Sequence, residues 1–241
     1  MATPKILAFS SSRVGNGNYL EAAVPEIKSL LGDGPINIAF VPFAGVTIGY
    51  DDYTRNVKDA LSGLPYNIEV VLPENAKAAI EKADAIMVGG GNTFKLLSMI
   101  YNTQVLDAIR NKVNNGTPYI GWSAGSNITG PTIATTNDMP IVEPKSFHAL
   151  GFFPFQINPH YYNVKPEGFN GETRDQRLTE FLIENPSMTV VCLPEGTALK
   201  LENNTLKLIG KCAGVVLTIK EGEHEVVRTA INAGDDITWL M

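Results

Sequence analysis

Five short apolar runs in the first half of the chain alternate with segments of helical spacing, and this alternation is the feature that most limits the fold. The runs occupy residues 5–9, 36–41, 68–72, 85–88 and 118–122. The helical segments occupy residues 19–31, 51–61, 74–83, 93–99 and 104–113. Strands that are apolar on both faces and alternate with helices predict a mainly parallel sheet flanked by helices. The predicted fold class is therefore α/β.

The second half of the chain has a different pattern. A helix is expected over residues 173–183 and a buried strand over 188–193. Alternating residues on either side of Asn203-Asn204 are typical of a hairpin, and 215–219 with 225–229 predict another antiparallel pair. No linker or repeat divides the sequence. We therefore expect a single α/β domain over residues 1–241 with antiparallel strands near its C-terminal end.

Charge, cysteine content and hydropathy exclude several classes of protein. The chain has 19 basic and 25 acidic residues, a net charge of −6, so nucleic acid is not an expected partner. No apolar run approaches the roughly 18 residues of a membrane span, and no signal-peptide pattern opens the chain. Cys192 and Cys212 lie in apolar, strand-like runs and are interpreted as small buried residues rather than a disulfide framework. We expect a cytoplasmic protein that needs no metal to fold.

One turn carries a nucleophile motif. Gly121-Trp122-Ser123-Ala124-Gly125 matches G-x-S-x-G and follows an apolar strand, which is the context that this motif requires. The glycines two residues before and two residues after Ser123 leave room for the sharp turn that exposes its hydroxyl. A glycine- and serine-rich loop that only packs a helix on a strand is the structural alternative. The strand before the turn favours a catalytic serine.

A serine nucleophile needs a base, and the chain has three histidines. His224 lies in an acidic turn and His148 in an amphipathic stretch, so both are expected at the surface. His160 follows Asn158-Pro159, and proline favours extended geometry in the residue before it. His160 is therefore expected at a strand end, where a base belongs.

Two carboxylates compete to orient that base. Glu195 directly follows the strand at 188–193, and would share an edge of the sheet with Ser123 if that strand were parallel to the one at 118–122. Asp138 precedes Met139-Pro140, where an Asx turn is the structural alternative. Strand-end position favours Glu195 only slightly, and both remain candidates.

Gly89-Gly90-Gly91-Asn92 joins a strand to a helix, and it admits two uses. Glycines at such a junction can cradle a phosphate, but the segment lacks the spacing of a dinucleotide fingerprint and the lysine of a Walker loop. The alternative is an oxyanion hole formed by the amides of Gly91 and Ala124. The neighbouring nucleophile motif favours the oxyanion hole.

Six segments of the chain together carry a resemblance to one known family. The segments that carry the resemblance occur in the family's order along the chain and cover most of it. They are Val41-Pro42-Phe43-Ala44-Gly45-Val46-Thr47, Val88-Gly89-Gly90-Gly91-Asn92-Thr93-Phe94, Ile120-Gly121-Trp122-Ser123-Ala124-Gly125-Ser126-Asn127, Thr135-Thr136-Asn137-Asp138-Met139-Pro140, Gln156-Ile157-Asn158-Pro159-His160 and Gly171-Glu172-Thr173-Arg174.

The six segments together resemble the peptidase E family of α-aspartyl dipeptidases. This resemblance implies a fold like the class I glutamine amidotransferase domain, which is flavodoxin-like. It implies serine-dependent hydrolysis, without a cofactor or metal, of dipeptides with an N-terminal aspartate. Ser123 matches the nucleophile and His160 the base. Glu195 matches the third member of the triad, while Asp138 matches a family aspartate that is a rival for the same role.

The resemblance also assigns the binding groups. Gly91 and Ala124 match the oxyanion-hole positions, and Arg174 matches the residue that holds the aspartyl side chain of the substrate. An arginine fork binds a carboxylate in a bidentate way and discriminates against a neutral amide. An ion pair on a helix surface is the structural alternative for Arg174. The expected partner is a small peptide, and a homodimer is left open.

Other functions fit parts of the sequence. A cyanophycinase-like peptidase would use the same catalytic set on Asp-Arg units. An esterase of the α/β-hydrolase fold would require the order serine, acid, histidine, which only Asp138 preserves. A nucleotide- or flavin-binding module could use the polar loops after the first and fourth strands. A relative that has lost activity would keep the fold alone.

Overall fold

The computed structural model describes residues 3–168, 170–220, 222–223 and 225–241, and its core is a seven-stranded sheet. The strand order is β3-β2-β4-β5-β1-β8-β9. The first five of these strands pair in parallel, and β8 and β9 add an antiparallel hairpin at one edge. Their bounds are Ile6–Phe9 for β1, Ile36–Val41 for β2, Tyr66–Val70 for β3, Ala85–Val88 for β4, Tyr119–Trp122 for β5, Thr197–Glu202 for β8 and Thr205–Gly210 for β9.

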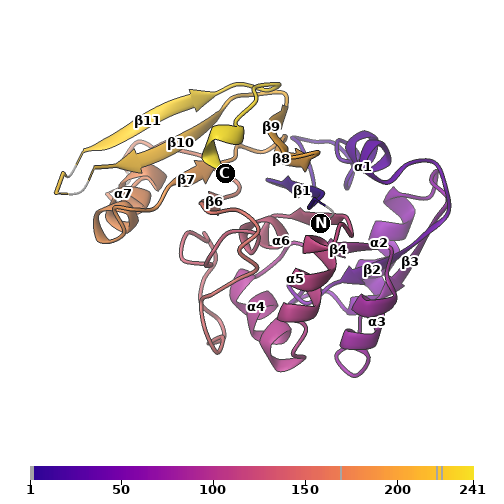
Figure 1. Cartoon of the computed structure of the whole chain (residues 1–241). Helices are drawn as coiled ribbons and strands as arrows, with labels where there is room; N and C mark the ends of the chain where they lie inside the picture. Colours follow the sequence, from indigo (N-terminus) through magenta and orange to yellow (C-terminus); the bar gives the residue numbers. More distant parts are fainter. Residues whose placement is uncertain (1–2, 169, 221, 224) are drawn as a thin grey trace.

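Helices cover both faces of this sheet (Figure 1). Alternate residues of each strand enter opposite cores, as the period of two along a strand requires: Ile6 faces one core and Leu7 the other. One core includes residues of α1 and α2, and the other includes residues of α3, α4 and α5. The helix bounds are Val24–Leu31 for α1, Tyr50–Ala60 for α2, Ala76–Lys82 for α3, Thr93–Asn102 for α4 and Leu106–Asn114 for α5. This arrangement confirms the predicted α/β class.

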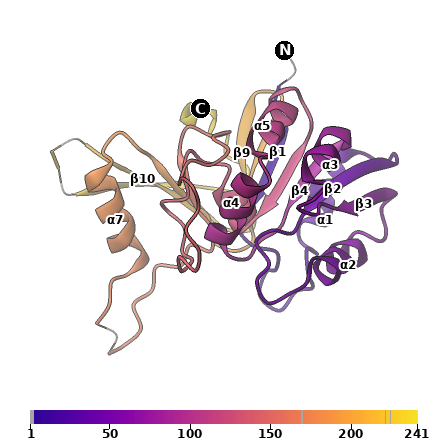
Figure 2. The ribbon, with the colours of Figure 1, turned by 90° about the horizontal axis from the view of Figure 1, so that it is seen from below.

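A second sheet of four strands lies beside the first, in the order β11-β10-β7-β6. β6 and β7 are parallel, whereas β10 pairs antiparallel with both β7 and β11. The strand bounds are Gln156–Asn158 for β6, Val190–Cys192 for β7, Gly214–Ile219 for β10 and Val226–Ile231 for β11. Helix α7, Arg174–Glu184, packs on this sheet through a separate small core, and Figure 2 shows it set apart from the other helices.

The second sheet corrects one expectation. Glu195 would share a sheet edge with Ser123 only if the strand before it were parallel to β5 in one sheet, but that strand, β7, pairs with β6 and β10 and not with β5. The predicted antiparallel pair over 215–219 and 225–229 is confirmed by β10 and β11. Residues 128–155 contain no named helix or strand. They connect the turn after β5 to the first strand of the second sheet.

Two shorter elements also differ from expectation. Helix α1 begins at Val24 rather than near residue 19, because Leu20 has a left-handed backbone (φ +56°) that a right-handed helix cannot include. Pro25 then lies in the first turn of α1, where a missing N–H costs no hydrogen bond. Helix α6 after the nucleophile turn is only Ala124–Asn127, and a 3-10 helix, Thr238–Leu240, closes the described chain.

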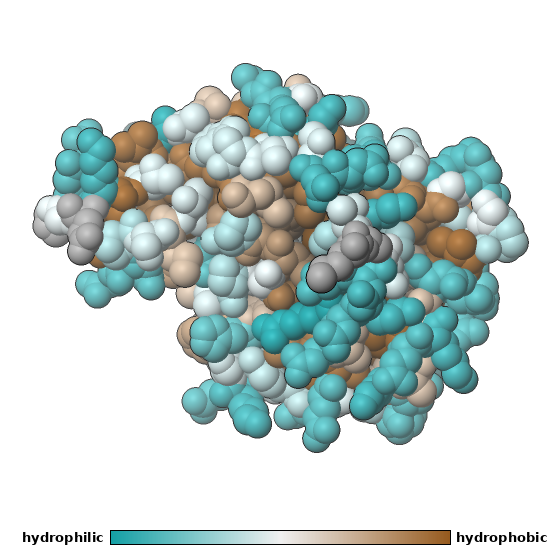
Figure 3. All heavy atoms as spheres, in the orientation of Figure 1, coloured by the Kyte–Doolittle hydropathy of each residue, from teal (hydrophilic) through white to brown (hydrophobic). Residues whose placement is uncertain are grey.

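The surface is mostly hydrophilic on the face drawn in Figure 3, and hydrophobic residues gather between the two sheets. Within the described residues, no helix has the length and apolar character needed to cross a bilayer.

Candidate active site

Ser123 lies at a sharp turn between β5 and α6. Its backbone is left-handed (φ +54°, ψ −114°), a strained conformation for a residue with a side chain. The Ser123 amide donates to the carbonyl oxygen of Phe9 at 3.0 Å, which fixes the turn against the end of β1. The turn therefore has the strand–serine–helix form that the motif predicts.

The glycines on either side of Ser123 are required by close backbone contacts. A Cβ atom on Gly121 would lie 2.4 Å from the carbonyl oxygen of Gly125. A Cβ atom on Gly125 would lie 2.2 Å from the carbonyl oxygen of Val88, at the end of β4. Both distances are far inside van der Waals contact, so any side chain at either position would force the turn away from the sheet.

His160 follows β6 by two residues and reaches Ser123 from the second sheet. Its backbone is also left-handed, with φ +51°. Neighbouring bonds hold it there: the Tyr161 amide donates to the Leu193 carbonyl at 3.0 Å, and Asn137 Nδ2 donates to the Pro159 carbonyl at 2.7 Å. The strain is therefore compensated by a fixed loop around the imidazole.

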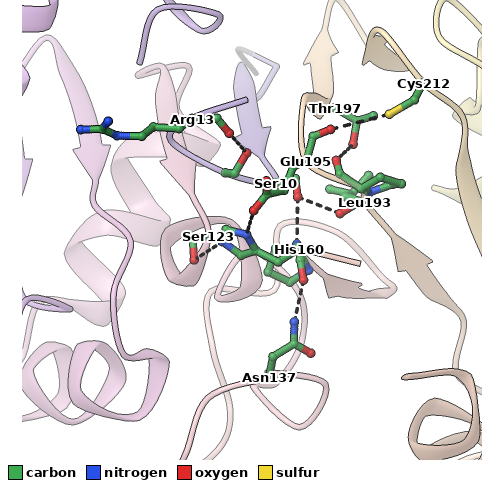
Figure 4. A network of polar contacts seen from close by, with 12 residues as sticks. Ser10, Arg13, Ser123, Asn137, His160, Leu193, Glu195, Thr197 and Cys212 are labelled. Carbon is green, nitrogen blue, oxygen red and sulfur yellow. Dashed lines mark hydrogen bonds and ion pairs between the residues drawn. The ribbon is translucent and has the colours of Figure 1, made fainter. Parts of the chain in front are cut away.

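Ser123, His160 and Glu195 form a continuous hydrogen-bonded chain (Figure 4). The Nδ1 atom of His160 lies 2.8 Å from Oε1 of Glu195, and its Nε2 atom lies 2.9 Å from Oγ of Ser123. A carboxylate can only accept, so Nδ1 carries the proton and Nε2 is free to accept from the serine hydroxyl. The side chain of Glu195 is 54% exposed, so its carboxylate remains in contact with solvent while it accepts from the ring.

Asp138 makes a different set of contacts. Its Oδ2 atom accepts from the backbone amide of Thr93 at 2.7 Å, from the Thr93 hydroxyl at 2.6 Å and from the Thr136 hydroxyl at 3.2 Å. Thr93 is the first residue of α4, where a carboxylate satisfies a free amide and opposes the positive end of the helix dipole. In the structure Glu195, and not Asp138, contacts His160.

The amides of Gly91 and Ala124 are available beside Ser123. Gly91 has φ +133°, and a Cβ atom there would lie 2.3 Å from the Ala44 carbonyl oxygen, so only glycine fits. The preceding Gly90 passes so close that its Cβ would lie 2.8 Å from Cβ of Ser123. Ala124 begins α6, so its amide has no partner within that helix. Neither amide donates a hydrogen bond to another residue that the structure describes.

A cavity of about 620 Å³ opens over Ser123. Its lining includes Gly91, His160 and Arg13, and no carboxylate among the described residues contributes to it. Arg13 is exposed, makes no ion pair with a described carboxylate, and lies 6.0 Å from the ring centre of Tyr19. Figure 4 shows its guanidinium directed away from Ser123 and His160. Arg13 is therefore the one arginine or lysine among the described lining residues, and its charge lies toward solvent rather than toward Ser123.

Arg174 does not line this cavity as described. It is the first residue of α7 and is partly buried, and within the described chain it forms no ion pair, so the surface pair that was its structural alternative is not present there. Burial and the like charge of Arg177 lower the pKa of the Arg174 guanidinium. The start of α7 is anchored by Asp175, which pairs with Arg228 and accepts from the hydroxyl of Tyr161, the residue after His160.

The other singled-out residues lie elsewhere. His148 is exposed, and its backbone forms an isolated bridge with Thr132. His224 lies outside the described residues. Cys192 is buried, which raises the pKa of its thiol, as expected for an unreactive core cysteine. Cys212 was also expected to be buried, but it is exposed because it lies in the turn before β10.

Sequence reasoning missed two residues that frame the site. Ser10, directly after β1, is fully buried and binds the backbone of His160 through its hydroxyl. Asn137, beside Asp138, binds the Pro159 carbonyl and accepts from Asn158 Nδ2 at 2.7 Å. The sequence offered one indication for Ser10: it is the first polar residue after a buried strand, and functional residues gather at the carboxyl ends of such strands.

Comparisons with known proteins give a consistent result. The model of peptidase family S51 matches residues 6–209. Peptidase E of Nostoc sp. is 50% identical over 226 residues, covering 93% of this chain and 92% of that protein. Peptidase E of Haemophilus influenzae Rd is 50% identical over 214 residues, covering 88% and 98%. A solved structure of a putative peptidase E from Listeria monocytogenes EGD-e has TM-score 0.69 at 24% identity, covering 87% of this chain and 100% of that one. At that identity the structural match shows the fold alone.

Proposed function

The chain belongs to peptidase family S51, and on that premise we propose that it is a serine-type dipeptidase specific for an N-terminal aspartate. The family membership makes it a peptidase and therefore a hydrolase. The finer proposal concerns three points: the nucleophile is Ser123, the base is His160 and the substrate is Asp-Xaa. By the family resemblance, the proposed reaction uses no cofactor or metal.

The single observation that carries the proposal is the Ser123–His160–Glu195 chain of hydrogen bonds beneath a cavity that opens over Ser123. A serine hydroxyl is a weak nucleophile unless a base takes its proton. The His160 Nε2 atom at 2.9 Å from Oγ is within the range for that transfer. The amides of Gly91 and Ala124, which donate to no other described residue, supply the remaining part of an acyl-transfer site.

In the acylation step, Ser123 Oγ attacks the carbonyl carbon of the N-terminal aspartyl residue while His160 Nε2 takes the hydroxyl proton. The carbonyl oxygen gains negative charge, which the amides of Gly91 and Ala124 stabilise by hydrogen bonding. His160 then gives its proton to the leaving amine, the C–N bond breaks, and the second amino acid departs. The aspartyl group remains as an ester on Ser123.

In the deacylation step, a water molecule takes the place of the leaving amine. His160 removes a proton from this water as it attacks the ester carbonyl, and the same two amides stabilise the second oxyanion. The proton on His160 passes to Ser123 Oγ as the ester bond breaks, which releases aspartate and restores the enzyme. Glu195 holds the imidazole in the required tautomer through both steps.

Arginine side chains near the site support an anionic substrate. The cavity lining includes Arg13 and no described carboxylate, and Arg174 lies near Arg177 at the start of α7, where Arg177 also pairs with Glu172. By the family resemblance, Arg174 is the proposed partner of the aspartyl side chain. Its lack of an ion pair to a described carboxylate and its partial burial are compatible with binding a carboxylate from solution.

The test of function is a panel of dipeptides: Asp-Leu, Asn-Leu, β-Asp-Leu and β-Asp-Arg. We expect hydrolysis of Asp-Leu with little of the others, because the proposed arginine site requires a carboxylate in the α-aspartyl position. Rapid cleavage of β-Asp-Arg instead would favour the cyanophycinase-like alternative. If the folded protein cleaved none of the four, the proposed substrate would be wrong.

Replacement of the two rival carboxylates should have different effects. We expect Glu195→Gln to lower kcat on Asp-Leu by at least about a hundredfold, because an amide can also donate to Nδ1 and no longer fixes the tautomer of the imidazole. Asp138→Asn should mainly lower stability, by about 1 kcal/mol, because it weakens the contact with the start of α4. Steady-state rates and thermal melting of both variants check this. A larger kcat loss for Asp138→Asn than for Glu195→Gln would reverse the assignment.

The two arginine candidates can be separated by substrate selectivity. We expect Arg174→Gln to lower the ratio of kcat/KM for Asp-Leu over Asn-Leu by about tenfold to a hundredfold, the size of one lost charge-assisted hydrogen bond. Arg13→Gln is the matched control, since it removes a charge from the cavity lining without touching α7. If Arg13→Gln alone abolished the selectivity, the aspartyl carboxylate would bind at Arg13 and Arg174 would have no role in specificity.

A cytoplasmic location is proposed with the function. Cys192 and Cys212 are both unpaired, and an exposed free thiol such as Cys212 fits a reducing compartment.

A further inference from the structure

Ser10 joins the two sheets beside the Ser123–His160 pair. It follows β1 directly, and its side chain is fully buried. Its hydroxyl donates to the Leu193 carbonyl at 2.7 Å and accepts the backbone N–H of His160 at 2.9 Å. A single side chain at the end of β1 in the seven-stranded sheet therefore binds both loops that leave the second sheet at the active site, one at Leu193 and one at His160 (Figure 4).

The residue before Ser10 has the matching role for the nucleophile. The Phe9 carbonyl accepts the Ser123 amide at 3.0 Å. Phe9 and Ser10 thus hold the backbones of Ser123 and His160 from consecutive positions. Because Ser123 follows a strand of one sheet and His160 a strand of the other, the 2.9 Å distance from Oγ to Nε2 depends on how the two sheets are joined.

The backbone of His160 needs such a bond. At φ +51° it has a conformation that residues with a side chain rarely adopt. Tyr161 and Pro159 are held by their own hydrogen bonds, to Leu193 and Asn137. The Ser10 hydroxyl holds the amide of His160 itself. Without that hydroxyl the amide loses its acceptor, and the peptide is free to turn toward a more favourable conformation.

We propose that Ser10 is a positioning residue for the general base: its hydroxyl fixes the backbone of His160 relative to the sheet that carries Ser123. The proposal rests on the proposed function, because it assigns Ser10 a role in activating the serine. In the alternative, Ser10 has a purely structural role as a contact between the two sheets. Its loss would then lower stability but would not act on catalysis through His160.

Ser10→Ala tests the proposal by steady-state kinetics on Asp-Leu. We expect kcat to fall by about tenfold to a hundredfold, the usual effect of a small displacement of a catalytic group. KM should change by less than about twofold, because Ser10 does not line the described cavity. Thr54→Val is the matched control: it removes another buried hydroxyl, one bonded to the Tyr50 carbonyl within α2, and should leave kcat unchanged.

A double-mutant cycle separates positioning from simple structural loss. If Ser10 acts through His160, Ser10→Ala should have no further effect on kcat in a His160→Ala background. Equal fold-losses in both backgrounds would overturn the proposal, as would a wild-type kcat for Ser10→Ala. If Ser10→Ala fails to fold, Ser10→Cys gives the same readout, because a thiol keeps the volume but hydrogen-bonds weakly.

A second readout does not depend on the dipeptide substrate. A small organofluorophosphate reacts as Ser123 Oγ displaces fluoride at phosphorus and the hydroxyl proton passes to His160. We expect Ser10→Ala to slow this labelling by the same factor as kcat. If the wild type is labelled at Ser123 but cleaves no aspartyl dipeptide, the substrate proposal fails and the Ser10 proposal is still decided by the labelling rate. Wild-type labelling by Ser10→Ala would overturn it.

Discussion

Ser123→Ala is expected to lower kcat on Asp-Leu by about 10⁴-fold to 10⁶-fold while the protein stays folded. The Ser123 hydroxyl is the atom that forms the acyl-enzyme, so without it His160 and the two amides can only assist direct attack by water. Other serine hydrolases that lose one triad member keep only the rate due to binding and the oxyanion hole. The fold should be preserved, because the side chain of Ser123 contributes one hydrogen bond, to His160, among those described.

The control for this variant is Ser126→Ala in the same turn. The Ser126 hydroxyl donates to the Ser123 carbonyl at 3.1 Å and does not contact His160 in the described structure. We expect it to retain a rate within about tenfold of the wild type. A Ser123→Ala protein with a rate within tenfold of the wild type would refute the nucleophile assignment. Rates must be measured on freshly purified protein, with thermal melting to show that both variants are folded.

Gly125→Ala is expected to have the largest effect on stability. The new methyl carbon would lie 2.2 Å from the Val88 carbonyl oxygen and 2.9 Å from its carbon, so either the turn or the end of β4 must move. We expect a loss of at least about 3 kcal/mol in the free energy of unfolding, which corresponds to a fall in Tm of about 6–12 °C for a protein of this size. Activity should fall with it, because Val88 leads into the loop of Gly91.

Gly63→Ala is the matched control for this prediction. No heavy atom lies within 4 Å of the position of its Cβ, so the substitution adds a methyl group without a clash. We expect a Tm equal to or slightly above that of the wild type, since alanine restricts the unfolded chain. If Gly125→Ala melted within a degree or two of Gly63→Ala and kept full activity, the account of the turn as a steric constraint would be wrong.

The first sheet was predictable because each of its elements is marked locally. Strands such as β1 and β4 are apolar on both faces, and helices on either side repeat at helical spacing, so the parallel sheet follows from pattern alone. The nucleophile turn was predictable for a related reason. Close backbone contacts at Gly121 and Gly125 leave no room for a side chain, so glycine stands at both positions and can be recognised in the sequence.

The β10–β11 pair was predictable from its own pattern, but its place in a separate second sheet was not, because that depends on contacts between distant residues. No pattern in residues 128–155 indicates that the chain leaves the first sheet after β5. The strands β6 and β7 have only three residues each, which is too short for a clear pattern. Strand-end position favoured Glu195 only slightly over Asp138, and the shared sheet edge with Ser123 that would have supported it is absent, although Glu195 does contact His160. Ser10 was overlooked because its partner is 150 positions away. The position of Arg174 outside the cavity depends on how α7 packs against β7 and β10.

The central claim is that hydrolysis passes through an aspartyl ester on Ser123, and hydroxylamine trapping tests it most directly. Hydroxylamine competes with water for the ester and gives aspartyl hydroxamate. If Asp-Leu, Asp-Ala and Asp-Lys share one acyl-enzyme, the ratio of hydroxamate to aspartate is the same for all three, and Ser123→Ala gives neither product. A ratio that changes with the leaving residue, or aspartate without hydroxamate at high hydroxylamine, would mean that water attacks the dipeptide directly and would contradict the account.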